Sequence, residues 1–208
     1  AGYPGLAGLL EKIKGGVALL DWSESRRQSI AWLVIPLAVG LGIYTGVLLS
    51  ALSARPFWNS GVLGPLFLVS GLSTAAVLPL LVGVGHAEKR FFERADLGLI
   101  AVELGLIALF LISLATGAAQ HLEALHLVWG GDYTVPFWLW FVLPGLLIPL
   151  LLELAALRGN RLSGLTAAVL VVAGGFMLRY LMVEIGQDST WSDYAMSFDP
   201  QLLQRLTP

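Results

Sequence analysis

The 208-residue sequence has no cysteine, and charged residues make up only 12% of it. Without thiols the chain cannot form a disulfide, ligate an iron–sulfur cluster or zinc through sulfur, or use a cysteine nucleophile. Basic residues never form a run longer than two and the formal net charge is −2, which excludes the class of nucleic-acid-binding proteins. Any iron–sulfur redox centre that works with this chain must therefore belong to a partner.

The chain is rich in apolar residues: 57% are hydrophobic, and the mean hydropathy is +0.80. Such values are typical of membrane proteins, whose solvent is mostly lipid. Apolar segments long enough to cross ~30 Å of hydrocarbon as helices cover residues 29–52, 61–84, 97–119, 134–157 and 162–183. Helices are predicted because lipid cannot satisfy an open strand edge. The predicted fold class is an all-α integral membrane protein, with one helical domain over residues 29–187.

The basic residues predict how these helices are oriented. Nine of the twelve fall on the side of the amino terminus, namely Lys12, Lys14, Arg26, Arg27, Lys89, Arg90, Arg94, Arg158 and Arg161. Arg55 and Arg205 fall on the other side. The positive-inside rule therefore predicts a cytoplasmic segment 1–28 and a tail 188–208 on the outer side, which in the inner membrane of a bacterium or archaeon is the periplasmic side. No signal-peptide pattern is present, and the start at Ala1 without methionine is compatible with an incomplete copy of a longer protein.

Aromatic residues gather on the predicted outer side: Trp58, Trp129, Tyr133, Phe137, Trp138, Trp140, Trp191 and Tyr194. One of them, Trp58, lies in the turn Arg-Pro-Phe-Trp-Asn at 55–59. In this turn Pro56 fixes the bend, and Asn59 is a candidate N-cap for the second helix. Two interpretations stay open. The turn is either an ordinary interfacial turn or, with Glu184 and Gln187, part of a surface where a partner docks.

A polar step, Tyr44-Thr45-Gly46, interrupts the outer half of the first apolar segment. A phenol at that depth can donate a hydrogen bond to a quinone carbonyl, and Gly46 could leave room for a flat ring. The alternative is a buried tyrosine that bonds a neighbouring carbonyl.

The second apolar segment is interrupted by residues that favour close helix packing, namely Pro65, Ser70, Gly71, Ser73 and Thr74. A functional role would require them to face Tyr44.

Three ionisable residues lie inside the predicted helices. Glu103 has no basic residue within one turn, so it is either a relay for protons or a neutral carboxyl that hydrogen-bonds within the bundle. Glu153 has two interpretations. It is close enough to the cytoplasmic end for its side chain to reach the membrane interface, or it lies on the same proton path as Glu103. Arg179 is expected to pair with Glu184 near the outer end, or to contact a quinone headgroup.

The histidines do not indicate haem or a metal. His86, His121 and His126 lie at helix ends or in loops, and no two are placed on facing helices as a b-type haem requires. His121 and His126 are five residues apart, which is a weak metal pattern. We therefore predict no metal, haem or iron–sulfur cluster in this chain.

Four stretches together resemble the NrfD/PsrC family, which contains the membrane subunit of polysulfide reductase and of related molybdenum enzymes. They are the Tyr-Thr-Gly step at 44–46, ARPFWN at 54–59, PLFLVSGLSTA at 65–75 and RYLMVEIGQ at 179–187. The resemblance covers about residues 35–187, most of the chain.

The resemblance implies a bundle of eight or more helices that exchanges electrons with menaquinone or ubiquinone. The partners it implies are a four-cluster iron–sulfur subunit on the periplasmic face and a molybdopterin-type catalytic subunit. Tyr44 matches the family's quinone-binding tyrosine, with Thr45, Gly46 and Arg179 as further candidates. Four further residues match the family's motifs, but the resemblance implies less specific roles for them: Arg55, Asn59, Glu184 and Gln187. Five helices are what an eight-helix member would retain without its first three, which supply polar quinone ligands in the family.

Two other classes of function remain. A transporter or proton channel would use Glu103, Glu153 and Arg179 to line its path, although the sequence lacks paired broken helices in symmetric halves. A purely structural anchor for peripheral subunits would bind no quinone.

Overall fold

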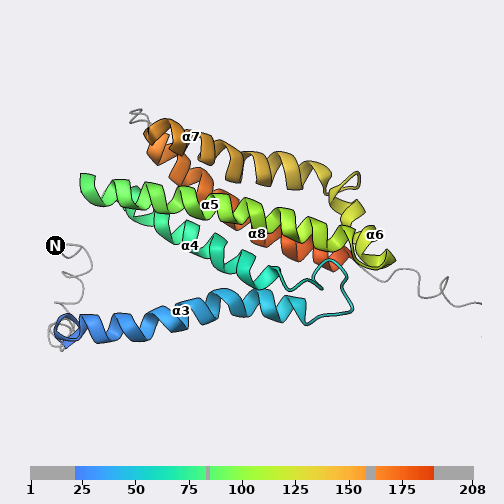
Figure 1. Ribbon diagram of the computed structural model, residues 1–208, viewed down its shortest axis with the longest axis horizontal. Coiled ribbons are helices and arrows are strands. Elements are labelled where there is room, and N and C mark those ends of the chain that lie inside the picture. The colour runs from blue at the N-terminus through green and yellow to red at the C-terminus, as the bar shows by residue number, and fades with distance from the viewer. Residues whose placement is uncertain (1–21, 83–84, 158–162, 190–208) are drawn as a thin grey trace, which may run out of the picture. The chain divides into compact units, whose positions relative to one another are not determined.

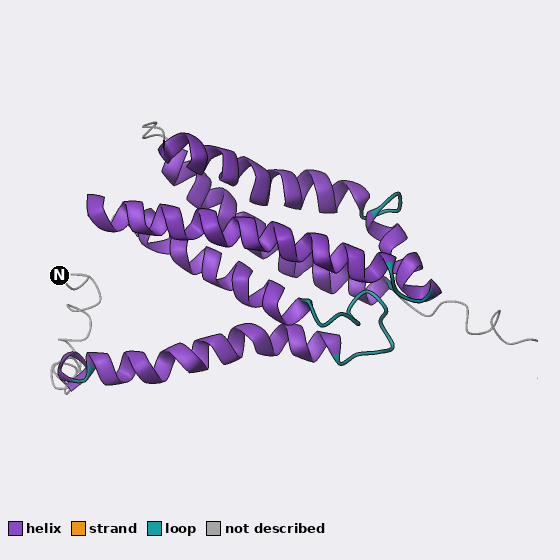
Figure 2. Ribbon diagram, viewed as in Figure 1, coloured by secondary structure: helices purple, strands orange, loops and turns teal. Residues whose placement is uncertain are grey.

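The computed structural model describes residues 22–82, 85–157 and 163–189, and every regular element in these ranges is a helix (Figure 2). Five of the described helices are long and apolar enough to cross a membrane, as the sequence predicts. Parts of the predicted segments 1–28 and 188–208 lie outside the described residues. So do Lys12, Lys14, Arg158, Arg161, Trp191, Tyr194 and Arg205.

The chain divides into two compact units, residues 1–41 and residues 42–208. Within the first unit the described residues belong mainly to the start of α3 (Arg27–Ser50), which contains Pro36. Their side chains are mostly exposed, as Trp32 and Leu37 illustrate. An apolar, exposed helix is what a lipid solvent permits.

The second unit is a helical bundle, coloured from cyan to red in Figure 1. It contains the end of α3, α4 (Leu63–Val82), α5 (His86–Ala115), α6 (Ala119–Val128), η1 (Pro136–Leu147), α7 (Ile148–Leu157) and α8 (Ser163–Asp188). Helix α4 packs closely against α5 and α8, and α8 also packs against η1 and α7. Helix α8 therefore lies at the centre of the contacts.

Small residues let two of these helices approach backbone to backbone. A Cβ built on Gly174 of α8 would lie 2.6 Å from the Cα of Gly145 of η1, so only glycine fits at this crossing. Gly46 of α3 meets the backbone of Leu63 and Gly64 at the start of α4 in the same way. Close approach at small residues commonly stabilises helix association in membranes. The hydrophobic effect does not drive helices together there, because lipid is as apolar as their side chains.

Helix α5 begins at His86, eleven positions before the predicted start at residue 97. The charged residues 88–94 lie between the second and third predicted segments, but they belong to the helix, and Lys89 and Glu93 form a 3.7 Å ion pair one turn apart. The predicted start is wrong because apolar length measures the lipid-crossing part of a helix and not its full extent. This error places Asp96 outside the membrane helix.

Three other features differ from the prediction at the opposite end of the bundle. The stretch 120–133 between the third and fourth predicted segments contains the helix α6, and the fourth span begins as the wide π-helix η1, with Pro144 inside it. Asn59 is not the N-cap of α4: the helix begins at Leu63, Asn59 is exposed, and the N–H of Val62 faces Ser60 Oγ at 3.4 Å. A hydroxyl one residue later thus serves the helix start.

Candidate functional site

Tyr44 lies on the part of α3 that belongs to the second unit, and 59% of its surface is exposed. Thr45 is exposed beside it, whereas Gly46 is buried against α4. Residues two apart on an α-helix point to nearly opposite sides. The phenol is therefore available to a ligand from the membrane, but Gly46 serves the helix contact and not a ring stacked at Tyr44. The interpretation as a buried tyrosine does not hold in this chain.

Arg179 lies on α8 and points towards α4. Its Nη1 donates a hydrogen bond to the carbonyl oxygen of Gly175 at 2.6 Å, and its guanidinium lies 6.0 Å from the centre of the Phe67 ring. The expected pair with Glu184 is not formed, and Lys89–Glu93 is the ion pair found in the described part of the chain. Residues five apart differ by about 140° around a helix, so the two side chains diverge.

Glu103 is buried in α5, with 2% of its surface exposed. Its carboxyl group interacts with Ser70 of α4 and lies in the electrostatic field of Arg179 of α8. Neither Glu103 Oε1 nor Ser70 Oγ has a partner in good hydrogen-bond geometry. The carboxyl thus has a cation nearby in space that the sequence does not reveal, because Arg179 comes from a helix 76 positions later.

A second buried cluster is a pair of carboxyl groups, Asp96 of α5 and Glu153 of α7, of which sequence reasoning missed Asp96. Asp96 is 0% exposed and Glu153 is 2% exposed, and the two side chains interact directly. Ser73 of α4 donates its hydroxyl hydrogen to Asp96 Oδ1. The interpretation in which Glu153 reaches the membrane surface is therefore wrong, because its side chain faces the bundle interior.

The two clusters lie along one side of α5. Asp96 and Glu103 are seven residues apart, which is two helical turns or about 10 Å along the axis. Their serine partners on α4, Ser70 and Ser73, are three residues apart and share a face of that helix. The seven-residue spacing of two acids is the signal in the sequence that could have revealed Asp96.

The turn after α3 is fastened to the end of α8. The Trp58 indole Nε1 donates a hydrogen bond to the Met182 carbonyl at 2.6 Å, and Arg55 Nη1 donates to the Gln187 carbonyl. Trp58 is only 7% exposed. It therefore fixes the turn rather than forming an open docking surface. Outward-facing positions in this region include Asn59 and Gln187, and Glu184 is half-buried.

Tyr133 lies at the same end of the bundle, just before η1. Its hydroxyl donates a hydrogen bond to Asp188 Oδ2 at the end of α8. That bond to Asp188, with smaller contributions from burial and nearby charges, raises the pKa of Tyr133 to about 12. The carboxylate thus holds the phenol in its neutral form and ties the loop before η1 to α8.

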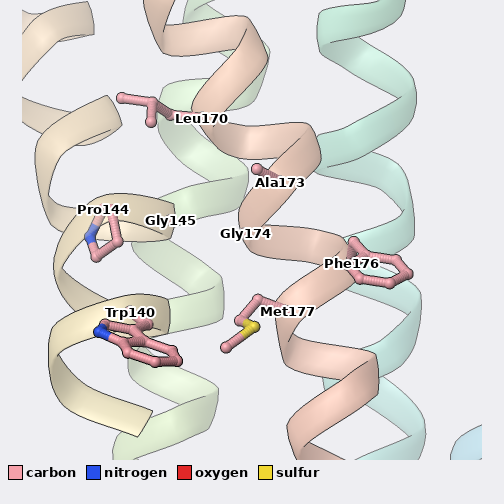
Figure 3. A pocket seen from close by; sticks show the side chains of 8 residues that line it. All are labelled: Trp140, Pro144, Gly145, Leu170, Ala173, Gly174, Phe176 and Met177. Atoms are coloured by element: carbon pink, nitrogen blue, oxygen red, sulfur yellow. The ribbon is translucent and has the colours of Figure 1, made fainter. Parts of the chain in front are cut away.

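Residues of η1 and α8 together line an apolar groove of about 290 Å³ beside the crossing of these helices (Figure 3). In Figure 3, Trp140 and Pro144 lie on η1 and Met177 of α8 lies between the two helices, while Phe176 projects from the opposite side of α8; Gly145 and Gly174 also line the groove. The lining suits a hydrocarbon chain, because it offers little polar surface for a headgroup. The described residues contain no group of three His, Cys, Asp or Glu side chains that could hold a metal.

These features define an all-α integral membrane bundle with buried acids on α5 and α7. The family model described as polysulphide reductase, NrfD, matches residues 8–189. The protein belongs to the NrfD family.

Among curated proteins, the chain is 32% identical over 189 residues to the protein NrfD homolog of Haemophilus influenzae, covering 86% of the chain and 59% of the relative. It is 35% identical over 172 residues to protein NrfD of Escherichia coli, covering 77% and 53%. It is 31% identical over 183 residues to a polysulfide reductase chain of Wolinella succinogenes, covering 82% and 57%. The sequence thus spans between about half and three fifths of these relatives. No solved structure matches it.

Proposed function

We propose that this chain is part of a quinone-reactive membrane subunit of a respiratory oxidoreductase, which exchanges electrons between membrane quinone and a periplasmic iron–sulfur subunit. The observation that carries the proposal is membership of the NrfD family. Two similar proteins are named as a chain of polysulfide reductase and a subunit of selenate reductase. Each name places its protein in a reductase of several subunits, and a chain without cysteine must rely on a partner for iron–sulfur chemistry.

Tyr44 is the residue that we assign to quinone. Its exposed phenol on a membrane-crossing helix can donate a hydrogen bond to a carbonyl oxygen, with Thr45 exposed beside it. A bound menaquinone or ubiquinone would supply two-electron, two-proton chemistry. Arg179 supports this assignment less directly, because its guanidinium lies against α4 and acts on Glu103.

Protons for quinone chemistry need a route through the bundle, and we assign it to Glu103 and Glu153. Both are buried, both face other polar side chains, and intramembrane acids are usually functional because their burial is costly. With the amino terminus in the cytoplasm, these acids would lie on the cytoplasmic side of Tyr44.

The end of the bundle formed by the turn at 55–59 and the end of α8 is our candidate for partner docking. Arg55 bonds the Gln187 carbonyl and Trp58 bonds the Met182 carbonyl, so the surface around Asn59, Glu184 and Gln187 is held rigid. A rigid surface reduces the entropy lost when a partner binds.

Extraction of lipids from the purified complex, followed by chromatography, tests the proposal. A quinone-reactive subunit should co-purify with menaquinone or ubiquinone, and added quinol should reduce its iron–sulfur partner. A purely structural anchor would yield no quinone above the level in bulk lipid. A transporter would show solute flux without any quinol-dependent reduction.

A further inference from the structure

The Asp96 and Glu153 carboxyl groups contact each other across α5 and α7, where both side chains are buried. Asp96 Oδ1 accepts a hydrogen bond from Ser73 of α4. The other oxygen of Asp96, Oδ2, has no donor in good geometry, and neither does Glu153 Oε2. Two ionised carboxylates only accept hydrogen bonds, so they cannot satisfy each other.

The charged groups around the pair offer little compensation. Glu93, one turn before Asp96 on α5, acts on Glu153 as a further negative charge and is itself paired with Lys89. Arg179 of α8 acts on Glu103, two turns away along α5. Helices α4, η1 and α7 contribute no further ionisable residue besides Glu153 itself in their described ranges. Two facing negative charges in such surroundings would repel strongly.

A proton between the two carboxyl groups removes both problems. The protonated oxygen becomes a donor to the partner's oxygen, the pair carries one negative charge instead of two, and the Ser73 hydroxyl stabilises the charge that remains on Asp96. We propose that Asp96 and Glu153 form a site that binds a single proton between α5 and α7. The site goes beyond the proposed quinone chemistry and does not depend on it.

The position of the pair suggests what the proton can do. The next buried acid on the same side of α5 is Glu103, about 10 Å further along the axis. Between them, Ser70 and Ser73 of α4 contact Glu103 and Asp96 respectively. A proton bound at the pair therefore has hydroxyl groups between it and Glu103, which would make the pair the entry position of the proposed proton route. This position rests on the proposed function, whereas the shared proton does not.

Infrared spectroscopy of the purified complex in lipid, with and without exchange into heavy water, tests the shared proton. The wild-type protein should show a protonated carboxyl band at neutral pH that persists in Glu103→Gln, since the band arises from the pair. In the Glu103→Gln background, where Glu103 no longer contributes, Asp96→Asn and Glu153→Gln should each remove the band completely. In each variant an amide donor faces the remaining carboxylate, so the second acid no longer needs the proton. Glu123→Gln, an exposed position on α6, is the matched control and should leave the band unchanged.

If each acid held its own proton, each replacement would remove only the part of the band that comes from the replaced acid. This result would overturn the proposal. A sodium ion held between the carboxylates would instead make the band absent in sodium buffer and present in potassium buffer, and this result would also overturn it. If the variants fail to assemble, the wild-type spectrum still decides, because a wild-type protein without any protonated carboxyl band contradicts a shared proton. Loss of quinone binding would leave these outcomes unaffected.

Discussion

The indole of Trp58 donates a hydrogen bond to the main-chain carbonyl of Met182 at 2.6 Å, across 124 positions of the sequence. Gly186 lies against the same ring, where a Cβ would overlap the indole. The motif around Trp58 and the motif around Glu184 thus pack against each other. Their joint occurrence in the sequence reflects this contact as well as any role in docking.

Replacing Trp58 with phenylalanine removes this hydrogen bond and part of a buried ring. We expect the free energy of unfolding to fall by about 1–3 kcal/mol. Thermal unfolding of the detergent-solubilised protein should show a lower midpoint. Trp32→Phe is the matched control, because 72% of the Trp32 surface is exposed. Equal midpoints for the two variants would contradict the role given to Trp58.

Gly174→Ala should weaken the crossing of η1 and α8. The new methyl group would lie 2.6 Å from the Gly145 Cα, so the helices must separate, at a cost of about 1–3 kcal/mol. The measurement is again thermal unfolding. Gly105→Ala serves as the control, because no atom lies within 4 Å of a Cβ at this position of α5. There, better helix propensity should stabilise the protein by about 0.5–1 kcal/mol, so the two variants should shift in opposite directions.

The Tyr133–Asp188 bond predicts a dependence on alkaline pH. The Tyr133 pKa of about 12 in the folded protein exceeds the value of ~10 for a free tyrosine, so the stability from this bond is complete below pH ~10 and is lost as the pH rises towards 12. Absorbance titration of tyrosinate should show a late-ionising component that is lost in Tyr133→Phe. Asp188→Asn should move that component to a lower pH. An unchanged titration in Asp188→Asn would show that the carboxylate is not the cause.

Glu103→Gln tests the proton route. The amide is nearly isosteric and can still contact Ser70, so the protein should assemble normally, while proton-coupled turnover should slow by at least ~10-fold. Quinol-dependent turnover and proton uptake by the reconstituted complex are the measurements. Glu123→Gln on α6 is the control. Wild-type values for both quantities in Glu103→Gln would leave Glu103 as a structural carboxyl.

The fold could be predicted from the sequence to the extent that lipid determines it. The five spans follow from apolar length, because any segment of that length and composition must be helical in a membrane. The start of α5 could not be predicted in this way, since Lys89 and Glu93 lie outside the apolar segment. Their part of the helix contains an ion pair one turn apart, and α5 as a whole packs against α4. The π-helix at Pro136 depends on backbone hydrogen bonding, for which hydropathy carries no signal.

The candidate site was predictable only residue by residue. Glu103 and Glu153 stand out because an acid in an apolar segment is rare. Their partners do not: Asp96 is hidden by a predicted helix start eleven positions too late, and Arg179 reaches Glu103 from α8. The sequence suggests a ligand contact for Gly46, whereas this residue packs against the start of α4, because a lone glycine fits both roles. Contacts between helices, which the sequence does not reveal, decide such cases.

The central claim is that Tyr44 contacts quinone, and the most direct measurement compares quinol-dependent electron transfer in Tyr44→Phe and Tyr180→Phe. Both tyrosines are about half exposed on membrane-crossing helices, but we assign only Tyr44 to quinone. Tyr44→Phe should lose a hydrogen bond worth ~1 kcal/mol and slow transfer about fivefold at limiting quinol, with assembly of the complex intact. Tyr180→Phe should transfer electrons at the wild-type rate. A wild-type rate in Tyr44→Phe would contradict the assignment.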